Sequence, residues 1–303
     1  MPDLIDIEKG AVCSTTDVEL LGGKAYQQAL AAADNLPVLR GLTLTTDVFP
    51  GRLWLQEQAG KSSAQQAEAV REHLKHRGVD LVAALRRVTG SRFAFRSSGN
   101  AEDSEPASFA GSFVSKLNVR PEGCFSAIYE VWASTFTERV RQYMSNRGLA
   151  GQWETLKMAV LIQPMVSPLL SGVALSHPPG KPDDPNILLT MVRGLGERLV
   201  GGAEPQSYSL ERGTWAIVEQ RDAIDTEIVY EAAAEIGRII EFLELRRGAG
   251  QDIELAIDWK YELTLLQNRS ISKGSGERPT PRASSDGGDH SPLGRPTNER
   301  DQG

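Results

Sequence analysis

Long helical patterns alternate with short β-like runs along most of this chain, and this alternation restricts the fold more than any other feature. Apolar residues recur at helical spacing in residues 24–35, 65–88, 122–147 and 227–247. Runs typical of strands lie at residues 92–96, 112–119, 157–163, 172–175, 186–192, 251–257 and 261–266. The mixture excludes all-helical and all-β folds and predicts an α+β or α/β architecture.

Two segments allow a more local prediction. In residues 122–147 the apolar side chains form one continuous stripe at spacings of three and four, which indicates a helix packed on the core. The last two strand-like runs are separated only by Asp258, Trp259 and Lys260, a connection short enough for an antiparallel hairpin.

The C-terminal segment has a different composition. From Lys273 to Gly303 the only aliphatic side chains are Ala283 and Leu293, among many Gly, Pro and Ser residues. Such a segment buries too little apolar surface to offset the entropy lost on ordering. We therefore expect the folded unit to end near residue 272 and residues 273–303 to form a disordered tail or linker.

Charge and hydropathy exclude several classes of protein. The formal net charge is −7, which disfavours nucleic-acid binding through a general basic surface. No apolar run approaches the roughly 20 residues of a membrane span, and residues 1–9 lack the features of a signal peptide. We expect a soluble, cytoplasmic protein that contacts neither membrane nor nucleic acid, with Cys13 and Cys124 as buried reduced thiols.

Three groups of residues are candidates for chemistry, and the first is Gly22-Gly23-Lys24. Two glycines let the backbone approach a ligand, and the helix that begins near Lys24 offers unpaired N–H groups. The lysine can then neutralise a phosphate. The alternative is a turn before a helix with a surface lysine.

The second group runs from Arg96 through Ser97, Ser98 and Gly99 to Asp103, and continues at residues 107–111. A strand ends here in an arginine and two hydroxyls, and a loop of small residues follows. Exposed hydroxyls and backbone N–H groups in such a loop can surround a polyphosphate, and the arginine supplies a fixed charge. An ordinary loop, with an ion pair from Arg96 to Glu102 or Asp103, explains the same composition.

The third group comprises Glu254, Gln267 and Arg269. If the last two strands pair, a carboxylate and an amide oxygen lie on neighbouring strands, and Mg²⁺ prefers such oxygen ligands. Arg269 follows Gln267 by two residues, so an extended chain directs both to one face. The alternative is a half-exposed hairpin with ordinary polar groups.

Other motifs in the chain are weaker indications of a functional site. Gly60-Lys61-Ser62 lacks the preceding glycine of a phosphate-binding loop, and we interpret it as a solvated segment before a helix. The pair Gly194 and Gly196 follows a strand and fits either a nucleotide contact or a tight turn. None of the four histidines lies at a spacing from a Ser, a Cys or a second metal ligand that would indicate a catalytic or metal site.

In combination and in this order, these segments resemble the N-terminal ATP-binding region of the phosphoenolpyruvate synthase and pyruvate phosphate dikinase family, which includes the rifampin phosphotransferases. The resemblance covers the whole folded unit. The matching segments are residues 21–25, 42–46, 95–111, 117–119, 131–135, 160–166, 171–173, 194–200, 251–254 and 265–271.

The resemblance implies an α+β, ATP-grasp-like fold in which two lobes, residues 1–165 and 166–272, clamp a nucleotide. Lys24 and Arg96 would hold phosphates, and a loop would cover them. Glu254 and Gln267 would bind Mg²⁺, and Arg269 would steady the transferring phosphoryl group. The remaining implied ATP contacts are the loop residues Ser108, Phe109, Ala110 and Gly111 and the adenine-slot residues Gln163, Met165 and Val166.

The chain also departs from the family pattern, at positions that leave every implied phosphate and metal group in place. These positions are Asn100, Ser112, Gln206, Leu255 and Ser270. Full-length members continue into a domain with a phosphorylated histidine, and none of the histidines here has that sequence context.

The resemblance implies an ATP-dependent phosphotransferase whose acceptor is a histidine on a separate partner protein or a small molecule. An ATP-grasp ligase that joins a carboxylate to an amine, and a non-catalytic ATP-binding module, are the alternatives.

Overall fold

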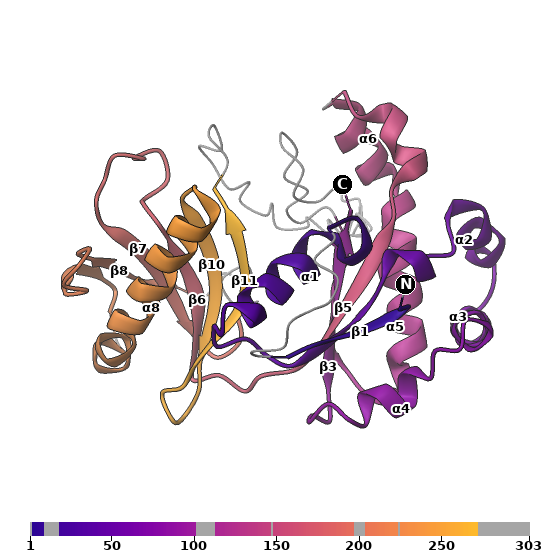
Figure 1. Ribbon diagram of the computed structural model, residues 1–303, viewed down its shortest axis with the longest axis horizontal. Coiled ribbons are helices and arrows are strands. Elements are labelled where there is room, and N and C mark those ends of the chain that lie inside the picture. Colours follow the sequence, from indigo (N-terminus) through magenta and orange to yellow (C-terminus); the bar gives the residue numbers. More distant parts are fainter. Residues whose placement is uncertain are drawn as a thin grey trace, which may run out of the picture.

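A computed structural model describes residues 2–8, 18–100, 113–146, 148–196, 204–223 and 225–271. The described strands form two antiparallel sheets, and helices cover their faces (Figure 1). The predicted α+β class is confirmed. The chain passes from the first sheet to the second through residues 165–169, because every strand of the first sheet precedes this linker.

The first sheet has five strands in the order β1-β2-β5-β3-β4. Their bounds are β1 Leu4–Ile7, β2 Gly41–Leu44, β3 Phe93–Gly99, β4 Lys116–Val119 and β5 Met158–Pro164. One face packs on helices to form the largest core cluster, centred on Phe93, Phe95 and Trp132.

The helices of the first half differ in length. They are α1 Val18–Ala33, α2 Arg52–Ala59, α3 Ser63–His76, α4 Leu81–Leu85, α5 Cys124–Ala133 and α6 Glu138–Asn146. Short 3-10 turns lie at η1 Thr46–Val48, η2 Pro121–Gly123, η3 Ser134–Phe136 and η4 Ala150–Thr155. The segment at Gly60–Ser62 does precede a helix, since Ser62 caps α3 with a capping box to Gln65.

The second sheet has six strands in the order β11-β10-β6-β7-β8-β9. Their bounds are β6 Leu170–Leu175, β7 Ile187–Arg193, β8 Gln206–Leu210, β9 Ile217–Arg221, β10 Gln251–Ile257 and β11 Leu263–Ser270. Helix α8, Thr226–Arg247, covers one face and buries Ile236, Ile240 and Leu243 against it. The β10–β11 pair confirms the predicted antiparallel hairpin.

Two predicted helices are interrupted, which corrects the sequence analysis. The pattern at 65–88 breaks after α3, where Gly78 takes a positive φ of 74° and Asp80 caps α4. The stripe at 122–147 breaks at η3, because Ser134 Oγ donates to the Val131 carbonyl and Thr135 Oγ1 to that of Trp132. These side-chain bonds compete with continued helix.

Helix α1 lies between the two sheets and contacts both (Figure 1). Leu21, Ala25 and Ala29 pack with Leu161 of β5 in a small core cluster, while Ala31 belongs to the cluster of the second sheet. On the β11 side, Asn268 Nδ2 donates to Gln27 Oε1 over 3.4 Å. Helix α1 is therefore one of the elements through which the two halves pack.

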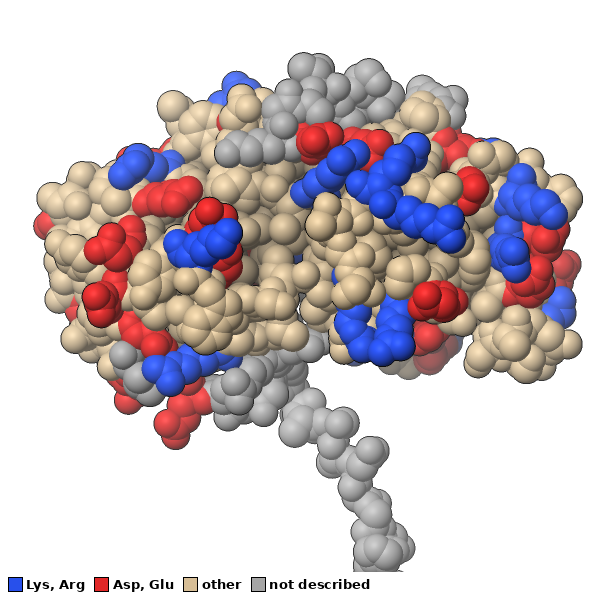
Figure 2. All heavy atoms as spheres, turned by 90° about the horizontal axis from the view of Figure 1, so that it is seen from below, with Lys and Arg blue, Asp and Glu red and all other residues tan. Residues whose placement is uncertain are grey.

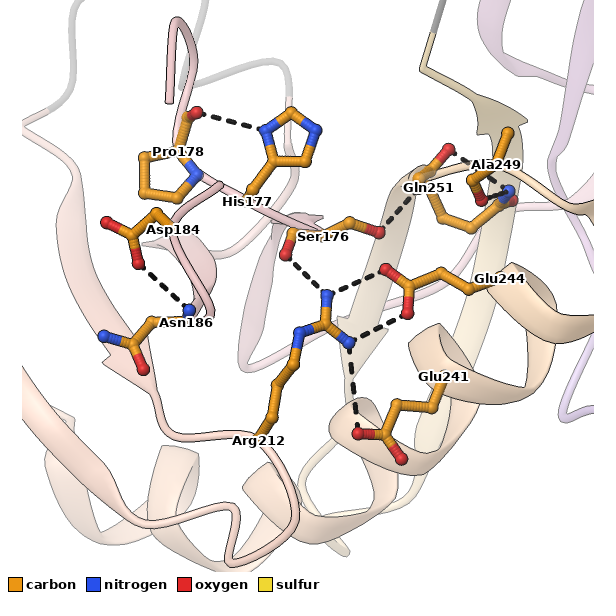
Figure 3. Close-up of polar contacts among 11 residues, drawn as sticks. Ser176, His177, Pro178, Asp184, Asn186, Arg212, Glu241, Glu244, Ala249 and Gln251 are labelled. Carbon is orange, nitrogen blue, oxygen red and sulfur yellow. Dashed lines mark hydrogen bonds and ion pairs between the residues drawn. The ribbon is translucent and has the colours of Figure 1, made fainter. Parts of the chain in front are cut away.

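Arg212 fastens the outer end of the second sheet to α8 (Figure 3). Its guanidinium donates to both carboxylate oxygens of Glu244, each over 2.8 Å, and to the Ser176 carbonyl over 2.7 Å. Ser176 Oγ in turn accepts the Gln251 N–H over 2.6 Å. This network joins the end of β6, the β8–β9 turn, α8 and the start of β10.

Charge is distributed unevenly over the surface. Figure 2, viewed from below Figure 1, shows several Lys and Arg side chains together on the half built on the first sheet. In the same half, Arg92 and Arg120 line a shallow hollow of about 450 Å³ with Ser91, Pro121 and Glu122. None of the helices in the described ranges combines the length and apolarity that a membrane span requires.

Candidate functional site

Arg96 crosses from the first sheet to the second. It lies in β3, and Nη2 donates to Gln267 Oε1 over 2.8 Å and to Glu254 Oε2 over 3.2 Å. Nη1 donates to the Leu266 carbonyl over 2.8 Å. The Arg96 side chain is only 16% exposed, against 38% for Glu254. Arg96 thus meets Glu254, 158 positions away in the sequence, and Gln267, 171 positions away, in one charged cluster.

Glu254 and Gln267 lie directly opposite one another in the β10–β11 pair. Directly opposite residues of an antiparallel pair share a face of the sheet. Ile253 and Leu255, which alternate with Glu254 in β10, pack on the opposite face under α8. A bulge follows this pair, since Leu255 is next matched with Leu265. The neighbouring-strand placement expected from sequence is therefore present.

Arg269 is the next residue on this face, opposite Asp252. Its Nε and Nη2 donate to Asp252 Oδ2 over 2.9 and 2.6 Å. The Asp252 side chain is 7% exposed, so this carboxylate holds the guanidinium from within the protein. Asp252 is a neighbour of Arg269 that our sequence analysis did not identify, although its position two residues before Glu254 in the same strand points to it.

Lys24 lies in α1 just after a kink. Gly22 has φ 69° and ψ 168°, which interrupts the helix. Ser98 of β3 repairs the interruption, because its Oγ accepts the Ala25 N–H and donates to the Leu21 carbonyl, each over 2.9 Å. Ser98 and Arg96 are two residues apart in β3, so this strand positions both Arg96 and the turn of α1 that carries Lys24.

The role expected for the hydroxyls after Arg96 is corrected by this arrangement. Strand β3 continues to Gly99, and Ser97 and Ser98 are buried within it rather than exposed in a loop. The loop residues Ser108, Phe109, Ala110 and Gly111, with Glu102 and Asp103, lie outside the described residues.

The residues expected to form an adenine slot lie at the linker between the sheets. Gln163 ends the buried part of β5, opposite Ala94, and its Nε2 has no hydrogen-bond partner among the described residues. Met165 N–H donates to the Arg92 carbonyl over 2.9 Å, and Val166 follows in the linker, half-buried. Gly194 N–H donates to the Leu169 carbonyl over 2.9 Å, which brings the first of the two glycines after β7 to the same place.

The oxygens of Glu254 and Gln267 suit a hard divalent cation. Within the described ranges no cluster of three or more His, Cys, Asp or Glu side chains is arranged to hold a metal. A carboxylate and a facing amide supply only part of the oxygen shell that Mg²⁺ requires, and Mg²⁺ commonly completes its shell with water and substrate phosphates. The donor set therefore fits Mg²⁺ bound together with a polyphosphate.

Gln206, one of the positions that departs from the family pattern, belongs to a network at the start of α8. Its Nε2 donates to Asp225 Oδ2 over 2.7 Å, and Asp225 also binds Arg193. The Arg193 guanidinium, and then Gln206, holds the pKa of the Asp225 carboxyl below its usual value. The network joins the end of β7 to the start of β8, on either side of Gly194 and Gly196.

Cys124 is buried at the start of α5, and burial raises the pKa of its thiol to about 12. The prediction of a buried, reduced thiol is confirmed at this position, because Cys124 is buried and forms no disulfide. Cys13 lies outside the described residues.

Comparison with known proteins decides the family. The model of the pyruvate phosphate dikinase AMP/ATP-binding domain matches residues 18–286, which is most of the chain. The chain belongs to this family. The family predicted from the sequence motifs is thereby confirmed, and Arg96, Glu254 and Gln267 lie within the matched AMP/ATP-binding domain.

Relatives of this AMP/ATP-binding domain are named as phosphotransferases or as phosphoenolpyruvate synthase. The uncharacterised phosphotransferase YvkC of Bacillus subtilis is 30% identical over 72% of this chain and 26% of its own length. A rifampicin phosphotransferase of Streptomyces sviceus is 30% identical over 85% of this chain and 35% of its own. Phosphoenolpyruvate synthase of Aeropyrum pernix is 28% identical over 67% of this chain and 28% of its own. This domain therefore spans about a quarter to a third of these relatives.

Proposed function

We propose that this AMP/ATP-binding domain is an ATP-grasp-like clamp that binds ATP with Mg²⁺ between its two sheets and catalyses ATP-dependent phosphotransfer. One observation carries the proposal: Arg96 of the first sheet reaches Glu254 and Gln267 of the second. The clamp comprises a lobe of residues 1–165 and a lobe of residues 166–272, followed by residues 273–303 as a tail or linker.

The phosphates of ATP lie between α1 and the β10–β11 pair in this proposal. Lys24 and Arg96 neutralise them, and the Ser108–Gly111 loop covers them. The kink of α1 supports this role for Lys24, because it is fastened to the same strand that carries Arg96. Phosphoryl transfer depends mainly on positioning and on neutralising charge, which fixed cationic side chains provide.

Glu254 and Gln267 would hold Mg²⁺, which would supply positive charge to offset that of the phosphates. Arg269 steadies the transferring phosphoryl group. Support comes from its neighbour Asp252, which holds Nε and Nη2 so that the guanidinium stays beside Glu254 and Gln267. Gln163, Met165 and Val166 receive the adenine at the linker, where the buried Gln163 Nε2, which has no partner within the described part of the chain, offers a hydrogen bond.

The acceptor is a histidine of a separate partner protein or a small molecule. The names of the phosphotransferase relatives support transfer, and their greater length is consistent with an acceptor site outside the matched domain. With a histidine acceptor, ATP and water give AMP and inorganic phosphate, and the β-phosphoryl group passes to the histidine nitrogen. With direct transfer of the γ-phosphoryl group to a small molecule, the product is ADP.

Product analysis tests the function. The protein is incubated with ATP and Mg²⁺, with and without proteins encoded nearby, and the nucleotides are separated by chromatography. AMP that requires a partner supports transfer to a histidine, and ADP with a single small-molecule acceptor supports direct transfer. ADP that requires both a carboxylate and an amine indicates a ligase, and binding without turnover indicates a non-catalytic module. The absence of both binding and hydrolysis refutes the proposal.

A further inference from the structure

Arg96 hydrogen-bonds one oxygen of each side chain that the proposed function assigns to the cation. Its Nη2 hydrogen-bonds Gln267 Oε1 and Glu254 Oε2, and its Nη1 is used by the Leu266 carbonyl. The guanidinium is mostly buried, so water screens this cluster less than it would an exposed ion pair. The arginine intended for phosphate and the carboxylate intended for the cation therefore neutralise one another when no ligand is bound.

This pairing opposes each ligand when it arrives alone. A divalent cation that uses Glu254 Oε2 and Gln267 Oε1 must displace Arg96 from them, and it then remains beside a guanidinium of like charge. A polyphosphate must take Arg96 from Glu254 and then remain beside a released carboxylate of like charge. Either separation leaves an uncompensated charge in a partly buried place, which is unfavourable.

Both ligands together remove the conflict. Arg96 transfers its hydrogen bonds to phosphate oxygens while Glu254 and Gln267 turn to the cation, so every released charge gains a partner of opposite sign. The cost of breaking the Arg96–Glu254 ion pair is then shared by two binding events. Coupling of this kind is reciprocal, since each ligand raises the affinity for the other by the same factor.

We propose that Arg96, Glu254 and Gln267 form a charge latch that makes cation binding and nucleotide binding depend on one another. The latch is shut in the ligand-free protein and is opened only by a divalent cation and a polyphosphate together. It also joins the two lobes, because Arg96 is on β3 and its partners are on β10 and β11. The proposal rests on the proposed function and specifies how the same site is regulated.

Cation binding in the absence of nucleotide gives the first test. Mn²⁺, titrated alone and followed by electron paramagnetic resonance, reports on the freed oxygens without any catalysis. Arg96→Ala should bind Mn²⁺ at least about tenfold more tightly than the wild type, the equivalent of one charge-assisted hydrogen bond. The double variant Arg96→Ala/Glu254→Gln should lose that gain.

Arg77→Ala is the matched control. Arg77 donates to both carboxylate oxygens of Asp3, so its removal also frees a carboxylate from an arginine. The control should leave Mn²⁺ affinity within about twofold of the wild type, because removing Arg77 frees a single carboxylate, whereas removing Arg96 frees ligands on two facing residues. Equal Mn²⁺ affinity in the wild type and Arg96→Ala overturns the latch.

Nucleotide binding without a cation gives the reciprocal test. Glu254→Gln keeps the side-chain shape but removes the charge that competes for Arg96. It should bind ATP in the presence of a chelator at least about tenfold more tightly than the wild type, while losing the enhancement by Mn²⁺. An unchanged or weakened cation-free affinity contradicts the latch, and this variant retains Arg96 should Arg96→Ala fail to fold.

Different results would refute the proposed function and the charge latch. If the wild type binds no ATP at any Mn²⁺ concentration, the proposed function itself is wrong. If the wild type binds ATP with Mn²⁺ but neither variant shows its predicted gain, the site is correct and the latch is wrong.

Discussion

Gly22 of α1 and Ser98 of β3 are in such close contact that a Cβ on Gly22 would lie 1.9 Å from the Ser98 carbonyl oxygen. Gly22 also has φ 69° and ψ 168°, a conformation that other residues avoid. Gly51 has nearly the same backbone angles, φ 82° and ψ 171°, but a Cβ there would meet no atom within 4 Å. Substitutions at these two glycines therefore distinguish the effect of backbone strain from that of close contact.

Gly22→Ala should lower the free energy of unfolding by about 1–3 kcal/mol more than Gly51→Ala, because it adds overpacking to the same backbone strain. Urea denaturation of the two variants and the wild type measures the difference. Equal losses would show that α1 can move away from β3 without cost.

Ser98→Ala should lower the free energy of unfolding by about 1–3 kcal/mol, since it removes the buried hydroxyl that bonds the Ala25 N–H and the Leu21 carbonyl. It should also weaken ATP binding, because the repaired turn positions Lys24. Ser62→Ala, which removes an exposed helix cap, should cost about 1 kcal/mol and leave ATP affinity unchanged. ATP affinity that is equal in the two variants would contradict the role of Ser98.

The sequence was sufficient for the fold class and for the strands with strong apolar patterns. The sequence did not predict β1, β2, α2, β8 and β9. In these elements the local apolar pattern is weak, or the element depends on contacts with residues distant in the sequence. Strand β9 illustrates the reason, because all but the first of its residues are exposed and no apolar alternation marks it. The break at η3 was missed since an unbroken apolar stripe conceals the side-chain bonds of Ser134 and Thr135.

For the site, strand pairing could be predicted but cross-lobe partners could not. The short connection at Asp258–Lys260 predicted that Glu254 and Gln267 would be neighbours. No local pattern indicates that Arg96, more than 150 residues away, reaches them. Ser98 was interpreted as an exposed hydroxyl because β3 was expected to end at Arg96, and only its pairing with β5 as far as Gly99 reveals its burial.

The ion pair between Arg212 and Glu244 should stabilise the second lobe without influencing the site. A double-mutant cycle with Arg212→Ala and Glu244→Gln should give a coupling energy of about 1 kcal/mol, since the pair is bidentate and partly buried. Each single variant should bind ATP as the wild type does. A coupling energy of zero would mean that the Ser176 carbonyl, not Glu244, is the important partner of Arg212.

Asp225 should make stability depend on pH in acid. Because Arg193 lowers the pKa of its carboxyl in the folded protein, the folded state binds this proton less readily than the unfolded chain. The stabilisation is complete above the unfolded pKa of about 4 and is lost as pH falls through the folded pKa.

Asp225→Asn should therefore be less stable than the wild type at pH 7, and the difference should shrink as the pH falls below about 4. Urea midpoints measured across this range test the prediction, with Asp183→Asn on an exposed turn as the control. A difference that is constant with pH would show that the charge of Asp225 contributes nothing.

The central claim is that ATP binds with a divalent cation where Arg96 meets Glu254 and Gln267. Calorimetric titration of the wild type and Arg96→Ala with a non-hydrolysable ATP analogue and Mg²⁺ tests it most directly, with Arg212→Ala as the matched control. We predict that Arg96→Ala weakens binding at least about tenfold and that Arg212→Ala has no effect. Wild-type binding that Arg96→Ala leaves unchanged would contradict the account.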